Sequence, residues 1–291
     1  MSVNVKENLV SPGLPLCESC MMELIVRMAV EACGEDTILF GGPCCCVMQE
    51  KTGVQYYGTM MTNMASSASG VSRARRRQGK DTTCLCIAGG GTTADIAFGC
   101  VSAAAERGER ILYICYDNEA YMNTGIQRSS STPRFAKATT SPVGTVIPGK
   151  TQNKKNLTDI IAAHNVPYVA QTTFIGNFRD LYTKAKKAIY TPGPSFLNVM
   201  SPCPRGWEYP TEKLPEICKL AVETCVWPLF EVIDGVWHLS YEPKQKRPVE
   251  EYLRMQGRFR HMFKPGNEWM IEAVQQNVDE NWEKLLNRCN Q

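Results

Sequence analysis

The residues of this sequence best suited to chemistry are three consecutive glycines, Gly89–Gly91, and a polar loop that follows the next predicted strand. Glycines lack Cβ atoms, so the backbone can approach a ligand closely, and a helix that begins there presents N–H groups to a diphosphate. The loop contains Asn118 and Asn123, and amide and backbone carbonyl oxygens are ligands that Mg²⁺ accepts. The dinucleotide-binding pattern G-x-G-x-x-G is not matched, because Thr92–Ala94 follows the glycines. These features predict a site for a diphosphate and a divalent metal, whereas the glycines alone are equally compatible with a tight turn that binds nothing.

Fourteen cysteines are many for a chain with no visible secretion signal, and they indicate metal ligands and buried thiols rather than disulfides. Cys17 and Cys20 form a CxxC before a predicted helix, a spacing that lets two thiolates converge on zinc or an iron–sulfur cluster. A zinc ribbon is poorly supported because no second CxxC is present, and a thioredoxin-like motif lacks its preceding strand. Six cysteines lie inside apolar segments and are expected to be small core residues: Cys33, Cys84, Cys86, Cys100, Cys115 and Cys218.

Short apolar strands alternate with helices along the chain, which predicts an α/β fold with a doubly wound, mostly parallel sheet. The glycines sit between a strand at 84–88 and a helix at 96–105, and a second strand at 111–116 precedes the polar loop. The segment 130–156 is long, irregular and contains three prolines, so we expect it to be functional or ordered by a partner. We expect residues 1–233 to form the domain that carries the glycines and cysteines, and residues 234–291 a helical tail that contacts partner subunits.

Composition excludes several classes of function. The net charge of +3 is too small to indicate a nucleic-acid partner, and the basic run Arg73–Lys80 has no interleaved aromatic residues for base stacking. No apolar run approaches the length of a membrane span. With no signal peptide visible, we expect a cytoplasmic protein.

One long block of the sequence carries a family resemblance. The run YDNEAYMNTGIQRS, continuing through TP to SPVG, closely resembles the β subunits of 2-oxoacid:ferredoxin oxidoreductases, especially the pyruvate synthase type, and the resemblance covers residues 14–235. It implies a thiamine-diphosphate-binding fold and the oxidative decarboxylation of a 2-oxoacid, with pyruvate as the default substrate and oxalate as a rival. It also implies that electrons pass through a [4Fe–4S] cluster to ferredoxin, and that the chain works with other subunits of the alpha, gamma and delta types. Coenzyme A usually accepts the acyl group in this family.

The resemblance assigns roles around the cofactor. Asn123 matches the asparagine that faces the thiazolium ring and the substrate, while Asn118, through its side chain, and Ala120, through its carbonyl, match Mg²⁺ ligands. The family turn reads Gly-Asp-Gly with the aspartate on the metal, so Gly90 lacks an expected carboxylate. Asp95 matches an acidic family residue that either caps the next helix, which we expect, or supports the diphosphate site. The cofactor-binding residues implied are Gly89, Gly90, Gly91, Thr92, Asp95, Asn123 and Thr124.

The resemblance also implies a ligand set for the cluster. The family uses an N-terminal CxxC, a cysteine after the next strand and a cysteine in an SPCPxGW block. These correspond to Cys17, Cys20, Cys45 and Cys203, with Cys44 and Cys46 as alternatives for the third ligand.

Two alternatives and one minor expectation accompany this interpretation. A non-catalytic iron–sulfur subunit that transfers electrons but has lost the cofactor would explain Gly90, whereas a thiamine-dependent carboligase would leave the cysteines unexplained. Lys150, Lys154 and Lys155 form a local basic patch that we expect to be part of a solvated loop.

Overall fold

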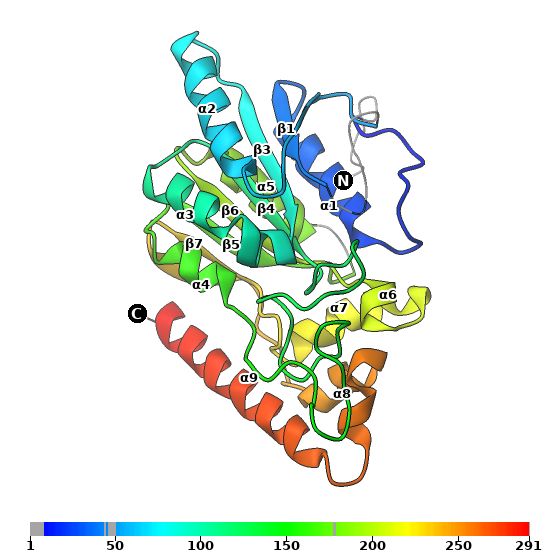
Figure 1. Ribbon diagram of the computed structural model, residues 1–291. Helices are drawn as coiled ribbons and strands as arrows, with labels where there is room; N and C mark the ends of the chain where they lie inside the picture. The colour runs from blue at the N-terminus through cyan, green and yellow to red at the C-terminus, as the bar shows by residue number, and fades with distance from the viewer. Residues whose placement is uncertain (1–8, 44, 46–50, 177–178, 291) are drawn as a thin grey trace.

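The computed structural model describes residues 9–43, 45, 51–176 and 179–290, and contains an eight-stranded sheet in the order β2-β1-β3-β4-β6-β5-β7-β8 (Figure 1). Strands β1 to β6 run parallel to one another, whereas β7 is antiparallel to its two neighbours, β5 and β8. The predicted α/β fold with a mostly parallel sheet is confirmed. The strands are β1 (Thr37–Gly41), β2 (Gln55–Gly58), β3 (Thr83–Gly89), β4 (Leu112–Asp117), β5 (Tyr168–Thr172), β6 (Ser195–Met200), β7 (Phe230–Ile233) and β8 (Val236–Leu239).

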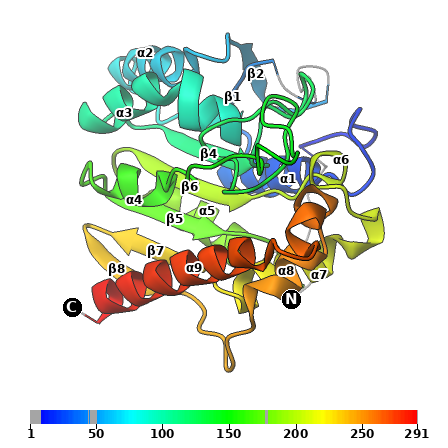
Figure 2. The ribbon, with the colours of Figure 1, turned by 60° about the horizontal axis from the view of Figure 1, so that its bottom comes forward.

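Helices cover both faces of the sheet, as Figure 2 shows. Helices α2, α3 and α4 lie on one face and α5 lies on the other, where it packs against α1. The longest helix, α9, runs along β8 on the face that carries α4. The helices are α1 (Met21–Cys33), α2 (Met64–Arg77), α3 (Phe98–Glu106), α4 (Leu157–Ala162), α5 (Arg179–Tyr190), α6 (Pro204–Trp207), α7 (Leu214–Glu223), α8 (Val249–Arg254) and α9 (Glu268–Cys289).

The central strands are apolar along their whole length because helices cover both of their sides. Every residue of β4, β5 and β6 is buried, whereas the edge strands β2 and β8 alternate between exposed and half-buried positions. Four of the predicted core cysteines, Cys84, Cys86, Cys115 and Cys218, are buried, as expected, while Cys33 and Cys100 are half-buried.

The C-terminal segment is part of the same body. Residues 236–239 form β8 and extend the sheet beyond β7, so the expected tail begins inside the sheet. The tail then buries several of its own side chains against the rest of the chain, namely Val249, Tyr252, Phe259 and Met262. This stretch has no obvious core pattern in the sequence. Its contact with partner subunits stays a prediction. None of the described helices is long and apolar enough to cross a membrane.

Candidate active site

The glycine turn lies at the carboxyl end of β3, next to the carboxyl end of β4, where open parallel sheets bind their ligands. A π-helical turn, Thr92–Ile96, follows the glycines before α3 begins, so regular helix starts slightly later than predicted. A Cβ atom at Gly90 would lie 2.3 Å from Asp117 Oδ1 and 2.8 Å from Ser131 Oγ. One at Gly91 would lie 2.8 Å from the ring of Tyr121. The glycines are therefore required by close packing against the polar loop, and they leave the backbone of the turn without side chains.

Asp117, the last residue of β4, is fully buried beside this turn. Its Oδ2 accepts a hydrogen bond of 2.6 Å from Lys154 Nζ, and its Oδ1 accepts one of 3.1 Å from the backbone N–H of Glu119. Burial raises the pKa of Asp117 above its ordinary value, although Lys154 opposes this shift. The Asp117 carboxylate thus occupies the space that a side chain at position 90 would need. It is already bound to the ammonium group of Lys154.

Glu119 is equally buried and has two cationic partners. Lys154 Nζ donates to Glu119 Oε1 at 2.9 Å, and Arg258 pairs with the other carboxylate oxygen. Burial by itself would raise the pKa of Glu119, but Lys154 and Arg258 outweigh it, so this pKa lies below its ordinary value. Lys154, Asp117, Glu119 and Arg258 form one buried ionic network, in which removing a cation would leave a carboxylate unpaired.

The prediction that Lys150, Lys154 and Lys155 belong to a solvated loop is wrong. Lys150 is almost fully buried and donates to the backbone carbonyls of Ser130, Thr132 and Asn153, and burial lowers its pKa to about 8. Lys154 is the centre of the ionic network, and Lys155 donates to a backbone carbonyl of the π-helical turn. The sequence carried a usable signal, because residues 120–158 contain six lysines and arginines but no aspartate or glutamate, whereas residues 117–119 include two acids.

Asp95 does not cap a helix, so that expectation is also wrong. Its Oδ2 accepts a hydrogen bond of 2.9 Å from the backbone N–H of Ser130 and a longer one from the Tyr121 hydroxyl. The π-helical turn places Asp95 inside the first turn rather than at its start, and α3 begins at Phe98 after Ala97, which provides no side-chain cap. Asp95 instead ties the glycine turn to the segment 130–156.

Asn118 offers an oxygen that nothing in the described part of the chain uses. The side chain is buried, and its Oδ1 has no hydrogen-bond partner, whereas its backbone carbonyl accepts from Trp207 Nε1 at 2.9 Å. A buried amide oxygen without a partner is unfavourable, and a hard cation would satisfy it. Ala120, the second expected Mg²⁺ ligand, is buried in the same loop. These oxygens fit a divalent metal, although Gly90 supplies no anionic ligand.

Asn123 and Thr124 occupy the exposed tip of the loop. Thr124 Oγ1 donates to Gln127 Oε1 at 2.6 Å, while the Asn123 side chain has no hydrogen bond within the described residues. An exposed amide of this kind is accessible to a substrate. The adjacent Met122 packs onto Gly206, where a Cβ atom would lie 2.2 Å from the methionine sulfur.

The SPCPRGW block therefore packs directly on the polar loop. Trp207 hydrogen-bonds to Asn118, and the Arg258 guanidinium lies 3.9 Å from the centre of the Trp207 ring while it pairs with Glu119. Cys203 precedes α6, and its Sγ accepts from the backbone N–H of Gly206 at 3.4 Å. Cys203 is thus positioned by the same packing unit as the candidate metal ligands.

The expected cluster ligands are only partly brought together. Burial raises the pKa of Cys203, and the nearby thiol of Cys17 adds to that rise, so these two cysteines are neighbours. Cys20 immediately precedes α1, and Cys45 packs at the edge of the core. Within residues 9–43, 45, 51–176 and 179–290, no three side chains of the Cys, His, Asp or Glu type form a group that could hold a metal, so a four-cysteine cluster site is not preformed here. The alternatives Cys44 and Cys46 lie outside the described residues.

Comparison with known proteins identifies the family. Residues 45–199 match the family model of the thiamine pyrophosphate enzyme C-terminal TPP-binding domain. The chain is 43% identical over 289 residues to the pyruvate synthase subunit PorB of Methanocaldococcus jannaschii, covering 94% of this chain and 95% of that protein. It is 40% identical over 289 residues to the ketoisovalerate oxidoreductase subunit VorB of Pyrococcus abyssi, covering 94% and 91%.

A solved structure has a similar fold. The 2-oxoglutarate:ferredoxin oxidoreductase of Magnetococcus marinus, with 2-oxoglutarate, coenzyme A and succinyl-CoA bound, matches with a TM-score of 0.60 and 22% identity over 69% of each chain. At that identity it supports the fold alone, and the sequence relatives carry the assignment. The chain belongs to the PorB family, the thiamine-diphosphate-dependent β subunits of 2-oxoacid:ferredoxin oxidoreductases of the pyruvate synthase type, and it is an oxidoreductase subunit.

Proposed function

We propose that this chain binds thiamine diphosphate at the Gly89–Gly91 turn and, with its partner subunits, carries out the oxidative decarboxylation of pyruvate. The observation that carries the proposal is the buried, unpartnered Asn118 Oδ1 beside a turn without side chains. The relatives act on pyruvate or on ketoisovalerate by their names, so a branched 2-oxoacid is the second choice, and nothing in these comparisons supports oxalate. We further propose ferredoxin as electron acceptor and coenzyme A as acyl acceptor.

The residues of the site have distinct tasks in this proposal. The chemistry that thiamine diphosphate supplies when bound is a nucleophilic carbon and an electron sink, which allows a 2-oxoacid to lose carbon dioxide. Asn118 and the Ala120 carbonyl would hold the Mg²⁺ ion that accompanies the diphosphate. Asn123 would face the substrate, because its amide is exposed and makes no hydrogen bond within the described residues. The ionic network around Lys154 keeps this loop in place. We assign no residue of this chain as the carboxylate that activates the cofactor, and expect a partner subunit to supply it.

Cofactor titration tests this proposal. In the complex stripped of thiamine diphosphate, we expect saturable cofactor binding in calorimetry that strengthens when Mg²⁺ is present. Asn118→Ala should weaken Mg²⁺-dependent binding by at least about tenfold, because it removes an oxygen ligand. Asn123→Ala is the matched control, since this side chain has no protein partner in the described part of the chain: binding should persist while turnover of pyruvate falls.

The same titration decides a second candidate function, a subunit that transfers electrons without binding the cofactor. The observation in its favour is that Gly90 has no carboxylate and that Asp117, the nearest one, already pairs with Lys154. Absence of cofactor binding with or without Mg²⁺ would establish this candidate and contradict the catalytic proposal.

We also propose that Cys17, Cys20, Cys45 and Cys203 hold a [4Fe–4S] cluster. The support is the proximity of Cys17 to Cys203 and the packing of the Cys203 turn on the cofactor loop. In the described part of the chain these cysteines do not yet form a complete ligand group.

Single cysteine replacements test the cluster. Cys17→Ser, Cys20→Ser, Cys45→Ser and Cys203→Ser should each lower the iron and sulfide content of the purified complex and remove most of its low-temperature EPR signal. Cys33→Ser is the control, because burial raises the pKa of that thiol to about 12 and makes it a poor ligand at neutral pH. A full cluster in Cys203→Ser would contradict the assignment.

A further inference from the structure

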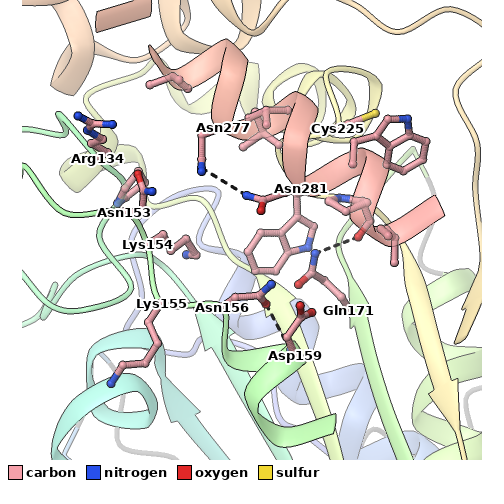
Figure 3. A pocket seen from close by; sticks show the side chains of 18 of the residues that line it. Arg134, Asn153, Lys154, Lys155, Asn156, Asp159, Gln171, Cys225, Asn277 and Asn281 are labelled. Carbon is pink, nitrogen blue, oxygen red and sulfur yellow. Dashed lines mark hydrogen bonds between the residues drawn. The ribbon is translucent and has the colours of Figure 1, made fainter. Parts of the chain in front are cut away.

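A cavity of about 190 Å³ lies between α9, the loop before α4 and the strands β5, β6 and β7. Figure 3 shows Arg134, Asn153, Lys154 and Lys155 along one side of it, with Asn277 and Asn281 facing them from α9. Its volume is comparable to that of an engineered cavity of roughly 150 Å³ that accommodates benzene. The space therefore suits a compound of one ring with a small polar substituent.

Several aromatic side chains line the cavity. Trp227, Phe230, Phe259 and Trp282 line it, and each of them is at least nine-tenths buried. Aromatic rings pack favourably against such walls in offset or edge-to-face contacts. The apolar part of a ligand that occupies this cavity is thus expected to be a flat ring.

Two buried side chains in the lining, Asn198 and Tyr252, each have a polar atom without a hydrogen-bond partner in the described residues. Asn198 is 3% exposed, and its Nδ2 donates to Thr158 Oγ1 at 3.2 Å, but its Oδ1 accepts from nothing in the described residues. The hydroxyl of Tyr252, which is 2% exposed, is likewise unpartnered there. Buried polar groups are rarely left unpaired in native proteins, so these two groups indicate an occupant that forms hydrogen bonds.

The charges of the lining favour an anion. Its two acids are already paired, Glu119 with Lys154 and Arg258, and Asp159 with Arg288. Arg134 and Lys284 have no carboxylate partner within the described residues, and Arg134 Nε is buried without an acceptor. The cavity consequently contains an excess of positive charge that its own acids do not balance.

From these observations we infer that the cavity is a binding site for a small aromatic carboxylate. The ring lies against the aromatic side chains, and the carboxylate is bound on the loop side of the cavity, where Arg134 has no carboxylate partner in the described residues. The site shares Glu119 and Lys154 with the network beside the glycine turn, but it is lined by α9 and β5–β7, and none of the residues Gly89–Asp95 reaches it. It is a second site, and it does not depend on the function proposed above.

Calorimetric titration of the full chain in its complex with benzoate tests the inference, with benzamide and acetate as probes that lack the charge or the ring. We expect saturable binding of benzoate and at least about tenfold weaker binding of either comparison compound, because each loses a charged hydrogen bond or the ring contacts. Saturating thiamine diphosphate should leave the benzoate affinity unchanged. Absence of saturable benzoate binding, equal binding of benzamide, or competition with thiamine diphosphate would each overturn the inference.

Variants locate the bound anion. Arg134→Met should weaken benzoate binding about tenfold. Lys264→Met, which replaces an exposed lysine outside the cavity lining, is the matched control and should bind as the parent does. Val278→Phe should abolish binding by filling the cavity. If that protein does not fold, the comparison of Arg134→Met with Lys264→Met tests the site instead. Equal effects of Arg134→Met and Lys264→Met would overturn the placement of the carboxylate.

Discussion

Replacing Lys154 by methionine is expected to lower the free energy of unfolding by about 3–5 kcal/mol, as when one partner of a buried ion pair is removed. The side chain is mostly buried and its ammonium contacts both Asp117 and Glu119. Glu119 keeps Arg258 in the variant, but Asp117 keeps only the backbone N–H of Glu119 and becomes a buried, uncompensated charge. Chemical denaturation monitored by circular dichroism measures the loss.

The pH dependence of this loss has a definite sign. Without Lys154, burial alone acts on Asp117 and raises its folded-state pKa further above the unfolded value, so its penalty applies at pH values above the folded pKa and is relieved as the pH falls. In the parent protein, Glu119 behaves oppositely, because its lowered pKa contributes stability that is lost as the pH falls through the folded value. The difference in unfolding free energy between parent and variant should therefore shrink on acidification.

An exposed lysine provides the control. Lys137 pairs with Glu208 at 2.8 Å, but the two side chains are 54% and 37% exposed, so Lys137→Met should change stability by less than about 1 kcal/mol. If Lys154→Met proves no more destabilising than Lys137→Met, the buried ionic network does not stabilise the fold.

Introducing the family's aspartate at position 90 should destabilise this chain rather than restore a typical site. The new Cβ would meet Asp117 Oδ1 at 2.3 Å, and the new carboxylate would be placed beside an existing one. We expect Gly90→Asp to lose at least about 1–3 kcal/mol of unfolding free energy from overpacking alone, measured by urea denaturation. Added Mg²⁺ should recover part of the loss, because a divalent cation relieves the repulsion between two carboxylates.

Two further variants separate the causes. Gly90→Ala introduces the steric conflict without the charge, so it should be destabilised but insensitive to Mg²⁺. In Gly90→Asp combined with Asp117→Ser, the shorter side chain relieves the contact with residue 117 and leaves only the one with Ser131 Oγ, so stability should exceed that of Gly90→Asp alone. Parent-like stability of the single Gly90→Asp variant would show that Asp117 does not occupy the space of the missing side chain.

The elements of the fold were predictable because each depends on local pattern. The strand at 84–88, the glycine turn and the strand at 111–116 were assigned within a residue or two of β3 and β4. Burial of a whole apolar strand requires helices on both sides, so the parallel sheet follows from the same pattern. The π-helical turn was missed, because nothing in the residues Thr92–Ile96 distinguishes it from the start of a regular helix.

The ionic network could not be predicted from local sequence pattern, because its members are far apart along the chain. Lys154 lies 37 residues from Asp117 along the chain, and a lysine-rich irregular segment resembles a solvated loop until its partners are known. Asp95 looked like a helix cap by position, yet its carboxylate binds Ser130, 35 residues away. The glycine turn was predicted as a diphosphate site from the residues themselves and Asn118 as a metal ligand from the family resemblance, and both roles stay predictions. The tertiary contacts that hold these residues could be obtained only from the structure.

The ion pair between Glu119 and Arg258 joins residues separated by 139 positions, and this has a consequence for synthesis. At a translation rate of about 5–20 residues per second, a nascent chain spends roughly 7–28 seconds between the emergence of the carboxylate and that of the guanidinium. Throughout this interval the sheet can form, but the loop carrying Asn118 lacks both Arg258 and, until residue 207 emerges, the indole of Trp207 that binds it. A chain stalled on the ribosome before position 258 is therefore expected to contain all the strands of the sheet, while the loop that carries Asn118 and Glu119 still lacks the contact with Arg258.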